Sequence, residues 1–152
     1  YYDNGVPRLR RGGTFSTLSF QLDAPPFADD EVFVAMHYPY TYTQLRAFLA
    51  ALEADPDRSG NMRRHALCET LAGNVCDEVS VSQFARDPAE VARRRVVVVT
   101  ARVHPGETNS SWMMHGILDF LTGPSAEALA LRSRFIFKLI PMLNPDGVVL
   151  GN

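Results

Sequence analysis

The chain has few cysteines, almost no lysine and no long apolar run. Its 152 residues include two cysteines, Cys68 and Cys76, which stand eight positions apart and form no CxxC pair. The expectation is therefore a pair of buried, reduced thiols, as in a cytosolic protein, and not a disulfide framework. The longest strongly apolar run, 96–101, is far too short to span a bilayer. No signal peptide or starting methionine precedes Tyr1, and we interpret the sequence as a fragment.

Several binding and catalytic motifs are missing as well. The chain contains no GxGxxG and no GxxxxGK, so nucleotide binding has no support. It also lacks a GxSxG elbow, and Ser110 and Ser111 are expected to be first-turn residues of a helix, not nucleophiles. The formal net charge of -2 gives no general reason to bind nucleic acid or an anionic membrane. The 14 arginines against a single lysine suit recognition of carboxylates, but codon bias is the favoured interpretation.

The composition is that of a globular protein, with 46% hydrophobic and 21% charged residues. The length allows one domain, or the edge of one domain and part of another. Periodicity and turn residues predict strands at 14–22, 31–37, 75–82, 96–101 and 135–143, and helices at about 45–52, 65–72 and 109–121. The first helix has Thr41 or Thr43 as its N-cap and ends at Asp55, and Thr108 caps the last one. Residues 57–61 and 144–147 are predicted as a loop and a turn.

The second half of this pattern is strand, helix, strand. Such a crossover predicts a parallel strand pair and an α/β fold from about residue 38 onward. The run 96–101 is continuous and β-branched, which is typical of a strand buried on both faces. Residues 1–37 are predicted to be the end of a separate β-rich N-terminal domain, and residues 38–152 the α/β part.

The chemically informative segment follows the strand at 96–101 and precedes the helix at 109–121. It contains His104 and Glu107, separated by Pro105 and Gly106. Proline fixes one dihedral angle and glycine allows a tight reversal, so a compact turn can direct both side chains at one point. Imidazole nitrogen and carboxylate oxygen are zinc ligands, and a catalytic zinc takes three protein ligands and a water. The sequence therefore indicates two ligands of a zinc site at the carboxyl end of a strand.

Four segments resemble the cytosolic carboxypeptidase family, a branch of the zinc metallocarboxypeptidases. The two most specific are HPGETNSSW, within residues 100–122, and PMLNPDG, within residues 135–152. YPYTYTQL at 38–45 is similar to the family's entry into the peptidase domain, and LCETLAGN at 67–74 to the segment before its second strand. The resemblance covers most of residues 14–152 in order. It implies the N-terminal half of a zinc carboxypeptidase domain, a mixed sheet with flanking helices.

The resemblance also implies a site and an activity. His104 and Glu107 match the family's first two zinc ligands. The third ligand, the residues that bind the substrate carboxylate and the catalytic glutamate are expected beyond Asn152, so no catalytic residue is assigned within the chain. The implied enzyme is cytosolic and removes glutamates from the C-terminal tails of polyglutamylated proteins such as tubulin. The implied partners are these protein or peptide tails, with no nucleic acid and no membrane. The isolated chain is expected to be inactive.

Two alternatives remain open at this point. One is a non-catalytic homologue that serves as a protein-binding module, and the other is a different HxxE zinc hydrolase of the N-acyl amino acid deacylase type. His115, the only later histidine, is expected to be an ordinary helix-surface residue and not a third ligand, and His37 and His65 to be surface or interface residues. Asn144 and Asp146 are of residue types that turn geometry alone explains.

Overall fold

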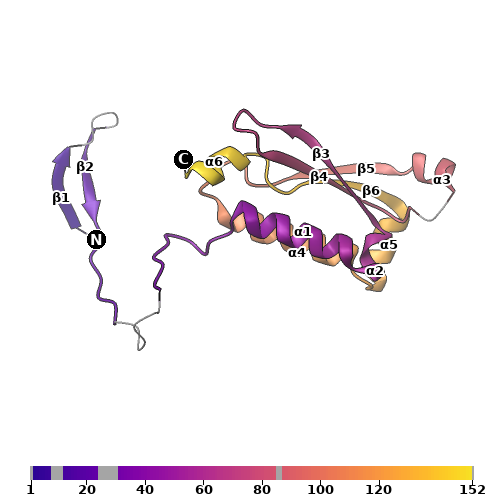
Figure 1. Cartoon of the computed structure of the whole chain (residues 1–152), viewed down its shortest axis with the longest axis horizontal. Helices are drawn as coiled ribbons and strands as arrows, with labels where there is room; N and C mark the ends of the chain where they lie inside the picture. The colour runs from indigo at the N-terminus through magenta and orange to yellow at the C-terminus, as the bar shows by residue number, and fades with distance from the viewer. Residues whose placement is uncertain (1, 8–11, 24–30, 85–86, 152) are drawn as a thin grey trace. The chain divides into compact units, whose positions relative to one another are not determined.

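The computed structural model describes residues 2–7, 12–23, 31–84 and 87–151. The chain separates into two compact units, Tyr1–Val34 and Ala35–Asn152. The elements of the first unit are β1 (Tyr2–Pro7) and β2 (Thr14–Thr17). The second unit contains α1 (Tyr42–Ala54), α2 (Pro56–Ser59), β3 (Met62–Glu69), β4 (Val75–Val81), α3 (Pro88–Ala92), β5 (Arg95–Thr100), α4 (Thr108–Thr122), α5 (Ala126–Arg134), β6 (Phe135–Ile140) and α6 (Pro145–Leu150), as Figure 1 shows.

The first unit is an antiparallel pair of β1 and β2. The strand predicted at 14–22 is confirmed only for its first four residues, and β1 was not predicted. The strand predicted at 31–37 is wrong, because these residues form no regular structure and the side chains of Phe33 and Met36 are exposed. An apolar, β-branched segment becomes a strand only where a neighbouring edge takes up its backbone hydrogen bonds. The domain boundary at residues 37/38 stays a prediction.

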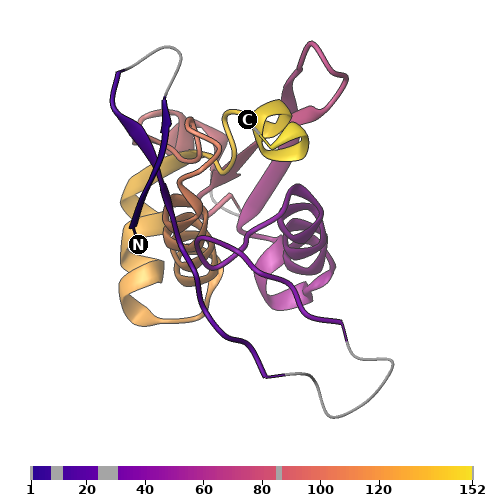
Figure 2. The same cartoon turned by 90° about the vertical axis from the view of Figure 1, so that its left-hand side faces the viewer.

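The second unit is built on a mixed four-stranded sheet in the order β3-β4-β6-β5. The parallel pair predicted from the strand–helix–strand pattern is confirmed, since β5 runs parallel to β6 in the register Val97↔Phe137. The other two pairs are antiparallel. Helices α1 and α4 lie side by side against the sheet (Figures 1 and 2). The core between them is Leu45, Leu49, Leu52, Met114, Leu118, Leu121, Val79, Val81 and Leu139.

The burial predicted for the strand at 96–101 is wrong. Val99 packs against the core, but the side chains of Val96 and Val98 are 55% and 62% exposed. β5 stands at one edge of the sheet. Because α1 and α4 pack on one face, alternate side chains of β5 point to the opposite face. In the described part of the chain those valines remain in contact with solvent.

The segment predicted as a helix at 65–72 is a strand. β3 pairs with β4 through a turn in which Gly73 has a φ of +79°, a conformation that favours glycine. Long-range pairing in this hairpin outweighs the weak local preference for helix. Of the two thiols near this turn, Cys76 is buried as expected, but Cys68 is exposed, and neither forms a disulfide.

The two longest helices, α1 and α4, lie close to their predicted positions. Thr41 caps α1 through a capping box in which its hydroxyl accepts from Gln44 N–H at 3.0 Å. The predicted loop at 57–61 holds the short helix α2, the predicted turn at 144–147 begins α6, and α3 and α5 were not predicted. In α4, Thr108 is the first helical residue and not the cap, which is Glu107. Its core positions include Met114 and Leu118, whereas Met113 is exposed. No helix among the described residues has the length and apolarity needed to cross a membrane.

Candidate metal centre

The two predicted ligands lie on one turn directly after β5, residues 102–107, which we call the metal turn. The turn closes with a hydrogen bond from Glu107 N–H to the His104 carbonyl at 3.1 Å. Nδ1 of His104 lies 3.1 Å from Oε1 of Glu107. The side chains are 73% and 55% exposed, so an ion can reach both atoms from solvent. The structure thus brings together the residues that the sequence singled out.

This spacing fits a shared zinc ion. Two ligand atoms at about 2.0–2.1 Å from a tetrahedral zinc are separated by roughly 3.3 Å, close to the observed spacing. A neutral imidazole nitrogen and a carboxylate oxygen are also the donor types that zinc takes in catalytic sites. Within residues 2–7, 12–23, 31–84 and 87–151, no group of three or more His, Cys, Asp or Glu side chains could hold a metal. Zinc binding by His104 and Glu107 stays a prediction.

The turn is held from one side by the side chain of Arg102. Nε of Arg102 donates to the Pro105 carbonyl at 2.9 Å, and its Nη1 donates to Ser111 Oγ at 2.9 Å. Ser110 Oγ accepts from Arg102 N–H at 3.0 Å and donates to the Glu107 carbonyl at 2.8 Å. Both serines therefore lie in the first turn of α4, as predicted, and there they bond the metal turn. Sequence reasoning did not single out Arg102.

The segment that follows β6 holds the turn from another side. Asn144 N–H donates to the Arg102 carbonyl at 3.2 Å, and Asn144 Nδ2 donates to the Val103 carbonyl at 3.3 Å. The backbone of Gly147 packs so closely that a Cβ built there would lie 2.8 Å from Pro105 Cγ. The HPGE and NPDG segments, 40 positions apart in the sequence, therefore form one structure.

Asp146 connects α6 to the tip of the β3–β4 hairpin. Its carboxylate accepts hydrogen bonds from Thr70 Oγ1, from Asn74 Nδ2 at 2.8 Å and from Ala72 N–H at 3.1 Å. The hydrogen bonds from Asn74 and Thr70 lower the pKa of Asp146. The expectation that turn geometry alone explains Asn144 and Asp146 is therefore wrong, because both also make contacts with distant segments. Neither the LAGN motif nor the NPDG motif by itself predicts that these two segments are in contact.

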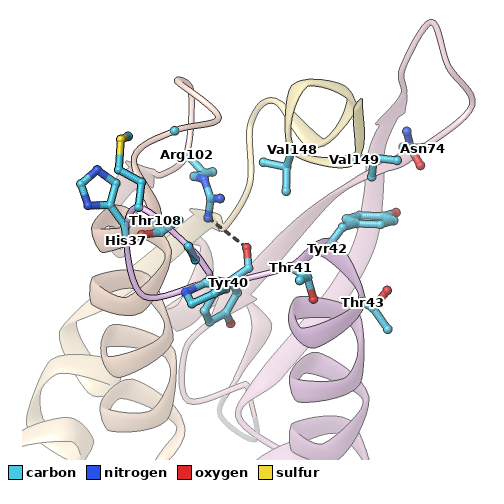
Figure 3. Close-up of a pocket in the computed structure, with 14 residues that line it drawn as sticks. His37, Tyr40, Thr41, Tyr42, Thr43, Asn74, Arg102, Thr108, Val148 and Val149 are labelled. Atoms are coloured by element: carbon cyan, nitrogen blue, oxygen red, sulfur yellow. Dashed lines mark hydrogen bonds between the residues drawn. The ribbon is translucent and has the colours of Figure 1, made fainter. Parts of the chain in front are cut away.

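A cavity of about 650 Å³ adjoins the other side of the metal turn. It is bordered by the start of α1, by α6 and by the turn itself, and Figure 3 shows Arg102 reaching from the turn toward the Tyr40 carbonyl. Among the described residues that line it, Arg102 is the only one with a permanently charged side chain, and Gly106 and Thr108 line it as well. His104 and Glu107 do not line this cavity. The position of the candidate metal centre therefore follows from the distance between their ligand atoms and not from the cavity.

The remaining histidines lie outside the metal turn. His115 is not the surface residue that was expected, because it is half-buried between α1 and α4. Its Nδ1 is 3.0 Å from Tyr40 Oη, and its ring stacks on Phe48 with centroids 3.5 Å apart. Burial lowers its pKa. His65 forms a pair with Glu78 at 3.2 Å, and His37 is exposed.

These features define an α/β protein with two candidate metal ligands at the carboxyl end of a parallel strand. A family model described as zinc carboxypeptidase matches residues 45–152, and the chain belongs to that family. Cytosolic carboxypeptidase 2 of Mus musculus is 48% identical over all 152 residues, which are 17% of that protein. Cytosolic carboxypeptidase 3 of Bos taurus is 43% identical over 152 residues, 15% of its length. The resemblance to cytosolic carboxypeptidases is thereby confirmed.

Solved structures agree on the fold. A putative carboxypeptidase A from Shewanella denitrificans aligns with a TM-score of 0.64 and 29% identity, over 75% of this chain and 28% of that one. The predicted fold class, a mixed sheet with flanking helices as in zinc carboxypeptidases, is confirmed. The chain spans less than a third of this structure and less than a fifth of the two curated relatives named above.

Proposed function

We propose that the protein is a zinc-dependent metallocarboxypeptidase that hydrolyses C-terminal peptide bonds. The observation that carries this proposal is the 3.1 Å approach of His104 Nδ1 and Glu107 Oε1 in a chain of the zinc carboxypeptidase family. His104 and Glu107 would hold the zinc. When bound, this ion supplies a Lewis acid for the scissile carbonyl and a means to activate water near neutral pH.

The proposal also covers the substrate, the cellular location and the residues that complete the active site. The substrates are the glutamate-rich C-terminal tails of polyglutamylated proteins such as tubulin, as the family resemblance implies. The names of the relatives support a cytosolic location. The third zinc ligand, the substrate-binding arginine and the catalytic glutamate are supplied beyond Asn152. In this chain, Arg102, Ser110 and Asn144 hold the turn that presents the first two ligands.

The experiment is a peptidase assay on the protein expressed from its complete reading frame. We expect release of glutamate from a peptide that ends in several glutamates, and no release from the same peptide with an amidated C-terminus. Removing zinc with a chelator is expected to abolish release, and adding zinc to restore it. The 152-residue chain alone is expected to release none.

The other outcomes separate the alternatives. Zinc binding without hydrolysis of any peptide would support a non-catalytic binding module. Cleavage of an N-acyl amino acid, but not of the peptide, would support a deacylase. Full activity in the presence of the chelator would contradict a zinc enzyme of either kind.

A further inference from the structure

Arg102 has an unusual backbone and an unusual environment. Its φ of 54° lies in the left-handed region, and it is the only residue other than glycine with a positive φ among those described. Such a conformation is unfavourable for a residue with a Cβ and persists only where surrounding contacts impose it. The residue is 4% exposed. The chain therefore buries a cation at the strained start of the metal turn.

Among the described residues, the guanidinium of Arg102 has neutral hydrogen-bond partners but no acidic partner. It bonds the Pro105 carbonyl, Ser111 Oγ and the Tyr40 carbonyl, the last at 3.2 Å. In the described ranges, no carboxylate lies within ion-pairing distance of Arg102. Burial lowers its pKa. Burying a cation without an acidic partner is unfavourable for stability. The directed hydrogen bonds of the guanidinium therefore explain better why an arginine stands at this position.

We propose that Arg102 is the positioning residue of the metal centre. Its planar guanidinium links three separate segments, namely the residues before α1, the first turn of α4 and the middle of the metal turn. Fixing the Pro105 carbonyl fixes the backbone between His104 and Glu107, and hence the spacing of their ligand atoms. Arg102 itself does not touch the metal. The inference rests on the proposed function, since the metal is taken to be zinc.

The test compares Arg102→Met with Arg132→Met. Arg132 is a matched control because it is also 4% exposed, has no acidic partner among the described residues and donates to neutral carbonyls, those of Leu121 and Gly123. Both variants are expected to unfold at a lower temperature in the metal-free protein. Only Arg102→Met is expected to weaken zinc binding of the folded protein, by about 10- to 100-fold, as for residues that orient ligands. Zinc affinity is measured by competition with a chromophoric chelator, on the protein from its complete reading frame.

Two milder variants keep the inference testable if Arg102→Met does not fold. Arg102→Lys and Ser111→Ala remove part of the hydrogen-bond pattern, and each is expected to weaken zinc binding less than Arg102→Met. Wild-type affinity in every folded Arg102 and Ser111 variant would overturn the inference and leave the proposed function intact. An equal loss in Arg132→Met would also overturn it. Failure of the wild-type protein to bind zinc would remove the proposed function and this inference together.

A second, independent observation concerns the two cysteines. Cys68 and Cys76 are direct partners across the antiparallel β3–β4 pair. Opposite residues in such a pair have Cα atoms about 4.5 or 5.5 Å apart, and both values lie within the range that a disulfide spans. Cys68 is exposed, whereas Cys76 is buried with its Sγ 3.5 Å from the Met142 carbonyl. One thiol is thus open to a solvent oxidant, and the second lies beside it.

We infer that this pair is a site of reversible oxidation by hydrogen peroxide. The thiolate of Cys68 attacks one peroxide oxygen, which gives a sulfenic acid and releases hydroxide. The sulfur of Cys76 then displaces the hydroxyl group, its proton leaves with it as water, and the S–S bond forms. The cysteines lose two electrons in total and peroxide gains them. The product links the two strands next to the turn of the hairpin, and that turn contacts Asp146.

Thiol counting after peroxide treatment tests this inference. We expect the count of free thiols to fall from two to zero on Cys68 and Cys76, with loss of two hydrogen atoms in the tryptic peptide mass and recovery on adding dithiothreitol. Cys68→Ser is expected to leave Cys76 reduced, because burial raises the pKa of its thiol to about 11 and limits its reactivity. A disulfide between two molecules, or persistence of both thiols in excess peroxide, would overturn the inference.

Discussion

Replacing His104 with alanine is expected to abolish peptidase activity and to weaken zinc binding more than about 100-fold, the upper end of the loss for residues that only orient ligands. The imidazole supplies one of the two ligand atoms in this chain, and Glu107 cannot hold the ion alone. The fold should survive, because the side chain is 73% exposed and is not one of the core residues. Exposed positions of this kind change the free energy of unfolding by about 0.5 kcal/mol or less.

His65→Ala is the matched control for this variant. His65 also forms a histidine–carboxylate pair on the surface, with Glu78 at 3.2 Å, but it lies on β3 and not on the metal turn. Zinc affinity and activity should therefore be unchanged in His65→Ala. Both variants are compared by zinc titration, glutamate release and thermal unfolding. Full activity in a folded His104→Ala protein would remove this residue from the site and, with it, the metal centre described here.

Gly147→Ala is expected to have the second large effect. A Cβ at this position would lie 2.8 Å from both Pro105 Cγ and Asn144 Nδ2, a distance that real Cβ contacts do not show. Asn144 cannot move away freely, because its side chain accepts from Gly147 N–H at 2.9 Å and caps α6. Overpacking of this kind costs about 1–3 kcal/mol of stability. The displaced Pro105 should also disturb the metal turn and weaken zinc binding.

Gly116→Ala separates the clash from the general effect of replacing glycine in a helix. Gly116 lies within α4, and a Cβ there would meet no atom within 4 Å. Alanine should stabilise that helix by about 0.5–1 kcal/mol relative to glycine. Urea unfolding of both variants should therefore give changes of opposite sign. A Gly147→Ala protein as stable as the wild type would show that α6 can move away from the turn without cost.

Local signals in the sequence were sufficient for part of the fold. The capping pattern at Thr41 and the β-branched run before Ala101 indicated α1 and β5 because neighbouring residues determine these features. The segment of β3 was predicted as a helix since its conformation depends on pairing with β4, which local propensity does not encode. The exposure of Val98 also escaped prediction, because the run does not reveal how many faces of the sheet are covered.

The candidate site also contains residues that the sequence predicted and residues that it did not. His104 and Glu107 were found because their residue types, spacing and position after a strand all point to a metal. Arg102 was overlooked since its function depends on partners as distant as Tyr40, which no local pattern announces. Asn144 was identified as a turn former, but its hydrogen bonds to the residues after β5 arise only in the folded structure. The candidate ligands are close together in the sequence, whereas the residues that hold them in position come from distant segments.

The bond between Arg102 and the Tyr40 carbonyl joins residues 62 positions apart, and the bond between Asn144 Nδ2 and the Val103 carbonyl joins residues 41 apart. Contacts of such wide separation form only after the chain has closed large loops. We therefore expect the ligand-bearing turn to acquire its shape late in folding, after the strands have paired. A short synthetic peptide with the HPGE residues would lack this shape, so transplanting the motif into another scaffold requires transplanting its surroundings as well.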